Sequence, residues 1–226
     1  MTFNHNAVDK VLAAIFPLPA EFGLDNDSKP LNFKLMQNQI KRVDACAYIY
    51  FGVSKMVIIS PNFNNIVIKI PFNGMFNYEA EWLPFKWASG SDHSDYCLTE
   101  YEKYRQLKNH GLNCFVAKTI LYKTINNVRV FIQEKVTPEE DRCFSNFIPS
   151  LKSKELARKW KEEGQFIFDT VWFANCLDKY GQTKVQKFLY YCTNIDLDIL
   201  EDIHEGNYGY RENGTPAILD YSNFSD

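Results

Sequence analysis

Apolar residues at the start of the chain recur every three or four positions over residues 6–16 and again over residues 31–43. This spacing predicts two short helices, each with one apolar face. The polar and proline-containing residues 25–30 are typical of a loop. Nothing in residues 1–44 indicates catalysis, and we expect this N-terminal helical extension to buttress the segments that follow.

A series of short β-strands is predicted next, because β-branched and aromatic residues dominate and the intervening residues favour turns. Between the third and fourth strands lie an aromatic-rich insertion, residues 71–97, and a helix, residues 98–109, that ends at a His-Gly pair. The predicted strands are residues 45–51, 56–60, 65–70, 114–121 and 127–136.

Beyond Pro138 the apolar spacing becomes helical, over residues 151–163, 166–180 and 183–193. This change from strands to helices predicts an α+β protein, with a β-rich part at residues 45–136 and a helical part at residues 137–226.

The composition is that of a folded protein, since 46% of the 226 residues are hydrophobic and the formal charge is only −3. That charge argues against general binding to nucleic acids. Residues 1–10 do not resemble a signal peptide, and no apolar run is long enough to cross a bilayer. The six cysteines lack a Cys-x-x-Cys pair, so we expect reduced thiols and a cytoplasmic protein without membrane contacts.

Chemistry is indicated most strongly near the end of the chain. Residues 202–207 read Asp-Ile-His-Glu-Gly-Asn, and an apolar run ends at Asp220, thirteen residues after Asn207. Carboxylate and amide oxygens in this arrangement can hold Mg²⁺ and orient a hydroxyl group. The alternative is an acidic hairpin in which Gly206 and Gly214 serve only as turn residues.

The two motifs together resemble the catalytic loop and the metal-binding Asp of the protein kinase-like superfamily. The loop is closest to the Asp-Leu-His-Pro-Gly-Asn form of aminoglycoside and choline kinases. The resemblance implies a two-lobed fold with an antiparallel-sheet N-lobe and a helical C-lobe. It also implies that Asp202 accepts or orients the acceptor hydroxyl, and that Asn207 and Asp220 hold Mg²⁺.

A lysine and a glutamate extend the resemblance. The third strand reads Ile-Val-Ile-Lys-Ile around Lys69, similar to the Val-Ala-Ile-Lys of kinases, where the lysine binds ATP phosphates. Glu100 on the following helix is then the glutamate that pairs with this lysine, and Glu102 is a lesser candidate. The alternatives are a lysine and a glutamate that both face solvent.

The turn at residues 52–55 corresponds to the kinase loop that covers the ATP phosphates. Only Gly52 is present where several glycines are typical, so Ser54 and Lys55 are expected to donate to the phosphates instead. Backbone groups near Glu134 and Val136 would bind the adenine at the hinge between the lobes.

Only six residues follow Asp220, so we expect a reduced C-lobe. Such short chains resemble phage-encoded kinase-like proteins. The resemblance implies an ATP- and Mg²⁺-dependent kinase that acts on an unidentified protein or small-molecule hydroxyl, in the host cytoplasm or the virion. The alternative is an inactive kinase-like module with a binding or structural role, as a virion or host-interaction protein.

Overall fold

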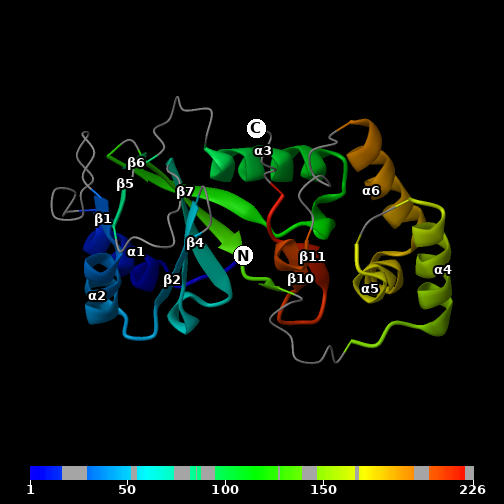
Figure 1. Ribbon diagram of the computed structural model, residues 1–226, viewed down its shortest axis with the longest axis horizontal. Coiled ribbons are helices and arrows are strands. Elements are labelled where there is room, and N and C mark those ends of the chain that lie inside the picture. The colour runs from blue at the N-terminus through cyan, green and yellow to red at the C-terminus, as the bar shows by residue number, and fades with distance from the viewer. Residues whose placement is uncertain are drawn as a thin grey trace. The chain divides into compact units, whose positions relative to one another are not determined.

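The protein is α+β, with antiparallel sheets and helices that belong to two compact units. One unit comprises residues 1–101 and 119–134, and the other comprises residues 102–118 and 135–226. The computed structural model (Figure 1) describes residues 1–16, 30–51, 55–73, 82–84, 86–87, 95–126, 128–138, 147–165, 168–195 and 204–221.

The first unit begins with helices α1 (His5–Ile15) and α2 (Phe33–Val43), which confirm the two predicted helices. Asn4 caps α1, because its side chain accepts a hydrogen bond from the amide of Ala7 at 3.2 Å. Residues 31 and 32, expected in the second helix, instead belong to strand β1 (Pro30–Asn32), which pairs with β5 (Trp82–Pro84).

The main sheet of this unit is antiparallel with the strand order β2-β3-β4-β8-β7, and β6 pairs with the end of β4. Apolar residues on one face of the sheet, among them Met56, Ile58 and Ile68, pack in one core with α1 and α2. Burial of this apolar surface holds the two helices on the sheet. The strands are β2 (Tyr48–Phe51), β3 (Lys55–Ile59), β4 (Ile66–Asn73), β6 (Lys86–Trp87), β7 (Thr119–Ile125) and β8 (Val128–Glu134).

Several bounds of the expected strands are wrong. The first strand starts at Tyr48 and not at residue 45, and the last ends at Glu134 and not at residue 136. Lys55 was expected in the turn before β3, but it is the first residue of that strand. The strand expected over residues 114–121 starts only at Thr119, because Asn113–Phe115 forms a 3₁₀ turn. Most of the aromatic insertion, and the turn residues 52–54, lie outside the described residues.

Helix α3 (Tyr96–Asn109) contains the boundary between the two units. Asp95 precedes the helix, and its carboxylate accepts from the amide of Leu98 at 2.9 Å, as an N-terminal cap does. The other carboxylate oxygen pairs with Arg129 of β8 at 2.9 Å. The start of α3 is therefore fixed to the sheet by a buried carboxylate.

Among its described residues, the second unit contains the C-terminal part of α3 and three further helices, which confirm the predicted helical part: α4 (Leu151–Glu162), α5 (Thr170–Tyr180) and α6 (Gln182–Asn194). Its small sheet has the order β11-β10-β9, formed by β9 (Thr137–Pro138), β10 (Tyr208–Tyr210) and β11 (Pro216–Ile218). The core is aromatic and includes Trp172, whose indole N–H donates to the carbonyl of Gly209 at 2.9 Å. This bond ties α5 to the hairpin.

Gly209 is required by packing within the small sheet. A Cβ atom added there would lie 1.9 Å from the carbonyl oxygen of Thr137 on β9.

Among the described residues, no helix is long and apolar enough to cross a membrane.

We predict that Leu12→Ala lowers the free energy of unfolding by about 2–5 kcal/mol, because Leu12 is only 1% exposed in the core of the first unit. Chemical denaturation measures the change. Lys10→Ala, at an exposed position on the same helix, serves as the control and should alter stability by less than about 0.5 kcal/mol. Equal effects of the two substitutions would show that α1 does not contribute to this core.

Candidate functional site

Two lysines lie on the same face of the main sheet, opposite the face that packs against α1 and α2. Lys69 of β4 is the register partner of Val57 on β3, and Lys55 precedes Val57 by two residues. Because side chains alternate between the two faces of a sheet, Lys55, Val57 and Lys69 share one face. Both lysines are buried, with only 4% and 2% of their surface exposed. The alternative in which Lys69 faces solvent is therefore wrong.

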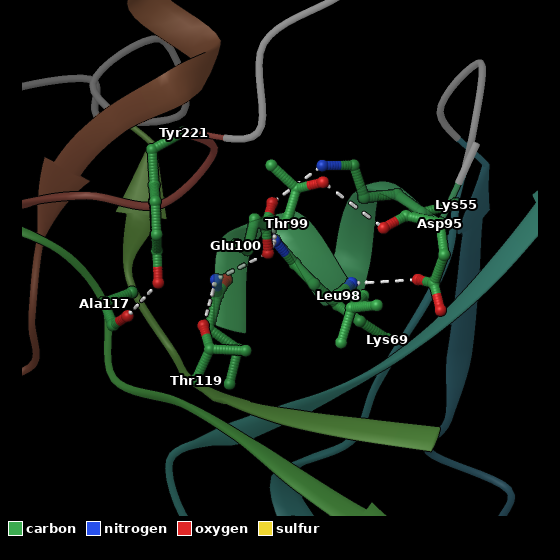
Figure 2. A network of polar contacts seen from close by, with 10 residues as sticks. Lys55, Lys69, Asp95, Leu98, Thr99, Glu100, Ala117, Thr119 and Tyr221 are labelled. Atoms are coloured by element: carbon green, nitrogen blue, oxygen red, sulfur yellow. Dashed lines mark hydrogen bonds and ion pairs between the residues drawn. The ribbon is translucent and has the colours of Figure 1, made fainter. Parts of the chain in front are cut away.

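Glu100 of α3 lies between the two lysines (Figure 2). Lys55 Nζ donates to Glu100 Oε1 at 2.7 Å, and Lys69 Nζ donates to Oε1 at 3.0 Å and to Oε2 at 2.9 Å. The carboxylate is fully buried. The structure thus brings Lys69 and Glu100 together as an ion pair and adds Lys55 to it, whereas Glu102 is exposed.

Gln133 of β8 completes the arrangement and was not identified from the sequence. Its amide nitrogen donates to Glu100 Oε2 at 3.1 Å and to the hydroxyl of Thr119 on β7 at 3.0 Å. A Gln that follows Val130, Phe131 and Ile132 on a central strand is the signal that could have found it, because a buried amide requires polar partners. With Gln133 in place, each oxygen of Glu100 accepts at least two hydrogen bonds.

The thiol of Cys97 lies near this cluster on α3. Burial raises its pKa well above the usual value, and the negative charge of Glu100 raises the pKa further. A buried thiol whose pKa is raised is a poor nucleophile, so Cys97 is not a candidate for the chemistry of this site.

Asn207 and Asp220 belong to the second unit, at the open end of the hairpin formed by β10 and β11. The amides of Leu219 and Asp220 donate to the carbonyl of Asn207 at 2.8 and 3.3 Å. The side chain of Asn207 is buried and that of Asp220 is half-buried. The hairpin therefore places a carboxamide and a carboxylate residue side by side, and both can supply the oxygen ligands that Mg²⁺ prefers.

Tyr221 directly follows Asp220 and is anchored in the second unit. It is 2% exposed, and its hydroxyl donates to the carbonyl of Ala117 at 2.8 Å (Figure 2). Gly214, at φ +78°, occupies the turn of the hairpin as expected of a turn glycine. On the other side of Asn207, the ring of His204 accepts from the amide of Gly206 at 3.1 Å.

The remaining predicted residues are placed only in part. Gly52, Ser54 and the predicted catalytic Asp202 lie outside the described residues. Glu134 is the last residue of β8 in the first unit. Val136 is buried in a small apolar cluster of the second unit. The roles of these residues stay predictions.

Within the described ranges, no group of three or more His, Cys, Asp and Glu side chains is arranged to hold a metal ion. Comparisons with protein-family models, with curated proteins and with solved structures give no significant match.

We predict that Glu100→Gln lowers the free energy of unfolding by about 3–5 kcal/mol. The substitution removes the buried carboxylate that two buried ammonium groups share, which leaves positive charge without this partner in a site of low polarity. Denaturant unfolding measures the loss. The matched control is Glu102→Gln on the exposed side of the same helix, for which the change should be below about 0.5 kcal/mol. A loss at Glu100 no larger than that of the control would contradict a stabilising ion-pair cluster.

Proposed function

We propose that this protein is a kinase-like phosphotransferase that uses ATP and Mg²⁺. In this proposal the first unit corresponds to the N-lobe of the protein kinase-like fold and the second to its C-lobe. The observation that carries the proposal is the buried ion pair between Lys69 of a central strand and Glu100 of α3. Protein kinases use a strand lysine and a helix glutamate paired in this way to bind ATP phosphates.

The burial of Lys69 supports a functional role over a purely structural one. Removal of a lysine and a glutamate from water is costly, and apolar residues of similar volume would stabilise a fold equally well or better. Lys69 is nevertheless present on a central strand and only 2% exposed. Its presence there is explained if its charge binds a ligand. In the proposed reaction Lys69 binds the α- and β-phosphates and Glu100 orients Lys69.

The hairpin of the second unit provides the second support. Asn207 and Asp220 bring two oxygen-donor side chains to one end of the hairpin, which fits the ligand chemistry of Mg²⁺. In kinases the metal ion neutralises the charge of the phosphates during transfer. Asp202 would accept or orient the acceptor hydroxyl, which belongs to a protein or a small molecule.

The sheet face around Lys69 has the apolar character that a nucleobase requires. Val67 is buried, Val57 and Ile59 are half-buried, and the register pairs Ile59 with Val67 and Val57 with Lys69. Tyr50, the partner of Val57 on β2, extends this face with an exposed ring. A flat aromatic base bound there would have apolar contacts for its faces, while backbone groups near Glu134 and Val136 would bind its edge.

We also propose a cytoplasmic location, in a host cell if the chain is encoded by a phage. The described cysteines are free thiols, as in proteins of reducing compartments.

We predict that Mg²⁺-ATP raises the melting temperature of the protein, because a ligand that binds only the folded state stabilises it. At an ATP concentration 100 times the Kd the stabilisation is about 2.7 kcal/mol, which corresponds to about 5–10 °C for a chain of this size. The shift should disappear when Mg²⁺ is omitted and should be lost in Asp220→Ala and in Lys69→Met.

Glu155→Ala is the matched control, since it removes an exposed carboxylate of the second unit from a position on α4 and should retain the full shift. No shift at millimolar Mg²⁺-ATP in the unmodified protein would contradict the proposed function. The inactive kinase-like module, with a binding or structural role, would then be the better description.

A further inference from the structure

We infer that Lys55 is a second phosphate-binding cation and that it acts together with Lys69 on adjacent phosphates of one polyphosphate ligand. This inference rests on the proposed function and gives Lys55, which the sequence only suggested as a phosphate donor, a defined place beside Lys69 in the binding site. In the resembled family, glycine-rich backbone covers the phosphates, whereas this chain has one glycine in the corresponding turn, residues 52–55. A side-chain cation from the start of β3 would take the place of the missing backbone donors.

The geometry of the sheet places the two ammonium groups close together. Lys55 and Lys69 project from the same face of neighbouring antiparallel strands, at positions diagonal to each other in the register. Both ammonium groups donate to the same oxygen atom, Glu100 Oε1, at 2.7 and 3.0 Å. Two groups that share one acceptor atom at these distances cannot be far apart, so they can contact neighbouring oxygens of one ligand.

Glu100 holds the two lysines differently. Lys69 spans both carboxylate oxygens, while Lys55 contacts Oε1. The amide of Gln133 donates to Oε2 and is itself fixed by the hydroxyl of Thr119. The carboxylate therefore cannot rotate without loss of several hydrogen bonds, and it keeps both ammonium groups in a fixed arrangement.

A structural role alone explains Lys55 poorly. Lys69 already contacts both oxygens of Glu100, and burial of a further charge in the same place adds a desolvation cost and repulsion between two cations. A ligand with negative charges on adjacent phosphates would reduce that repulsion. Nucleoside triphosphates and diphosphates fit this requirement, whereas adenosine lacks the charge entirely.

Calorimetric titration of Mg²⁺-ATP, inorganic tripolyphosphate and adenosine into the full chain tests the inference. Lys55→Met should weaken binding of Mg²⁺-ATP and of tripolyphosphate by about 10- to 100-fold, the effect of one lost hydrogen bond between charged groups. Adenosine affinity should not change. Lys55→Arg, which keeps the charge, should recover most of the loss.

The control is Lys34→Met, which removes an exposed lysine of α2 in the same unit and should leave all three affinities unchanged. If Lys55→Met does not fold, Lys55→Gln keeps a hydrogen-bond donor for Glu100 without the charge, and the same loss is expected.

The outcomes separate the inference from the proposed function. Normal affinity for Mg²⁺-ATP in the Lys55 variants would overturn the inference and leave the kinase-like function standing. An equal loss of affinity for ATP and adenosine would also overturn it, because Lys55 would then only maintain the shape of the site. If the unmodified protein binds neither Mg²⁺-ATP nor tripolyphosphate, both the inference and the proposed function are overturned.

Discussion

The buried carboxylate of Glu100 is the interaction on which the candidate site depends. Two lysines and a glutamine from three strands of one sheet donate to it, so a single side chain of α3 connects the helix to β3, β4 and β8. Charges at this depth are stable only when they are paired and hydrogen-bonded. The position of the helix and the direction of the lysines are therefore set together.

The two faces of the main sheet follow different physical rules. The face that packs against α1 and α2 is apolar and is held by burial of hydrophobic surface, which tolerates substitutions that preserve volume. The opposite face is organised by specific polar contacts, with Arg129 and Asp95 at the start of α3 and Gln133 beside Glu100. Such contacts fix side-chain geometry more narrowly than apolar packing does, as a binding site requires.

In the second unit, hydrogen bonds from buried side chains set the position of the candidate metal ligands. The hairpin that carries Asn207 and Asp220 is held by Trp172, which binds the carbonyl of Gly209, and by Asn175, which donates to the hydroxyl of Tyr210 at 2.9 Å. Tyr221 then anchors the chain directly after Asp220. Hydrogen bonds from these three side chains thus hold the hairpin and the residue after it in place, and with them the candidate metal ligands at the open end of the hairpin.

Much of this arrangement could be predicted because it is local in sequence. The apolar neighbours of Lys69 indicate a central strand, and the residues around Glu100 indicate a helix. The glycines Gly206 and Gly214 indicate the turns of a hairpin. The sequence indicated Lys55 as a phosphate donor in a turn, but its place on β3 and its bond to Glu100 could not be predicted, because the register between β3 and β4 is set by tertiary packing. Gln133 could have been found from its place after three apolar residues of a central strand, but its contact with Glu100 is tertiary and could not be predicted.

The central proposal is that Lys69 of the first unit, paired with Glu100, binds the phosphates of a nucleotide. An acyl phosphate derivative of ATP, which transfers its acyl group to a lysine beside the phosphates, tests this claim directly when the labelled lysines are located by mass spectrometry. If the proposal is right, Lys69 or Lys55 is acylated, and excess Mg²⁺-ATP blocks this labelling. Labelling confined to exposed lysines, or labelling of the buried pair that excess Mg²⁺-ATP does not block, would contradict it.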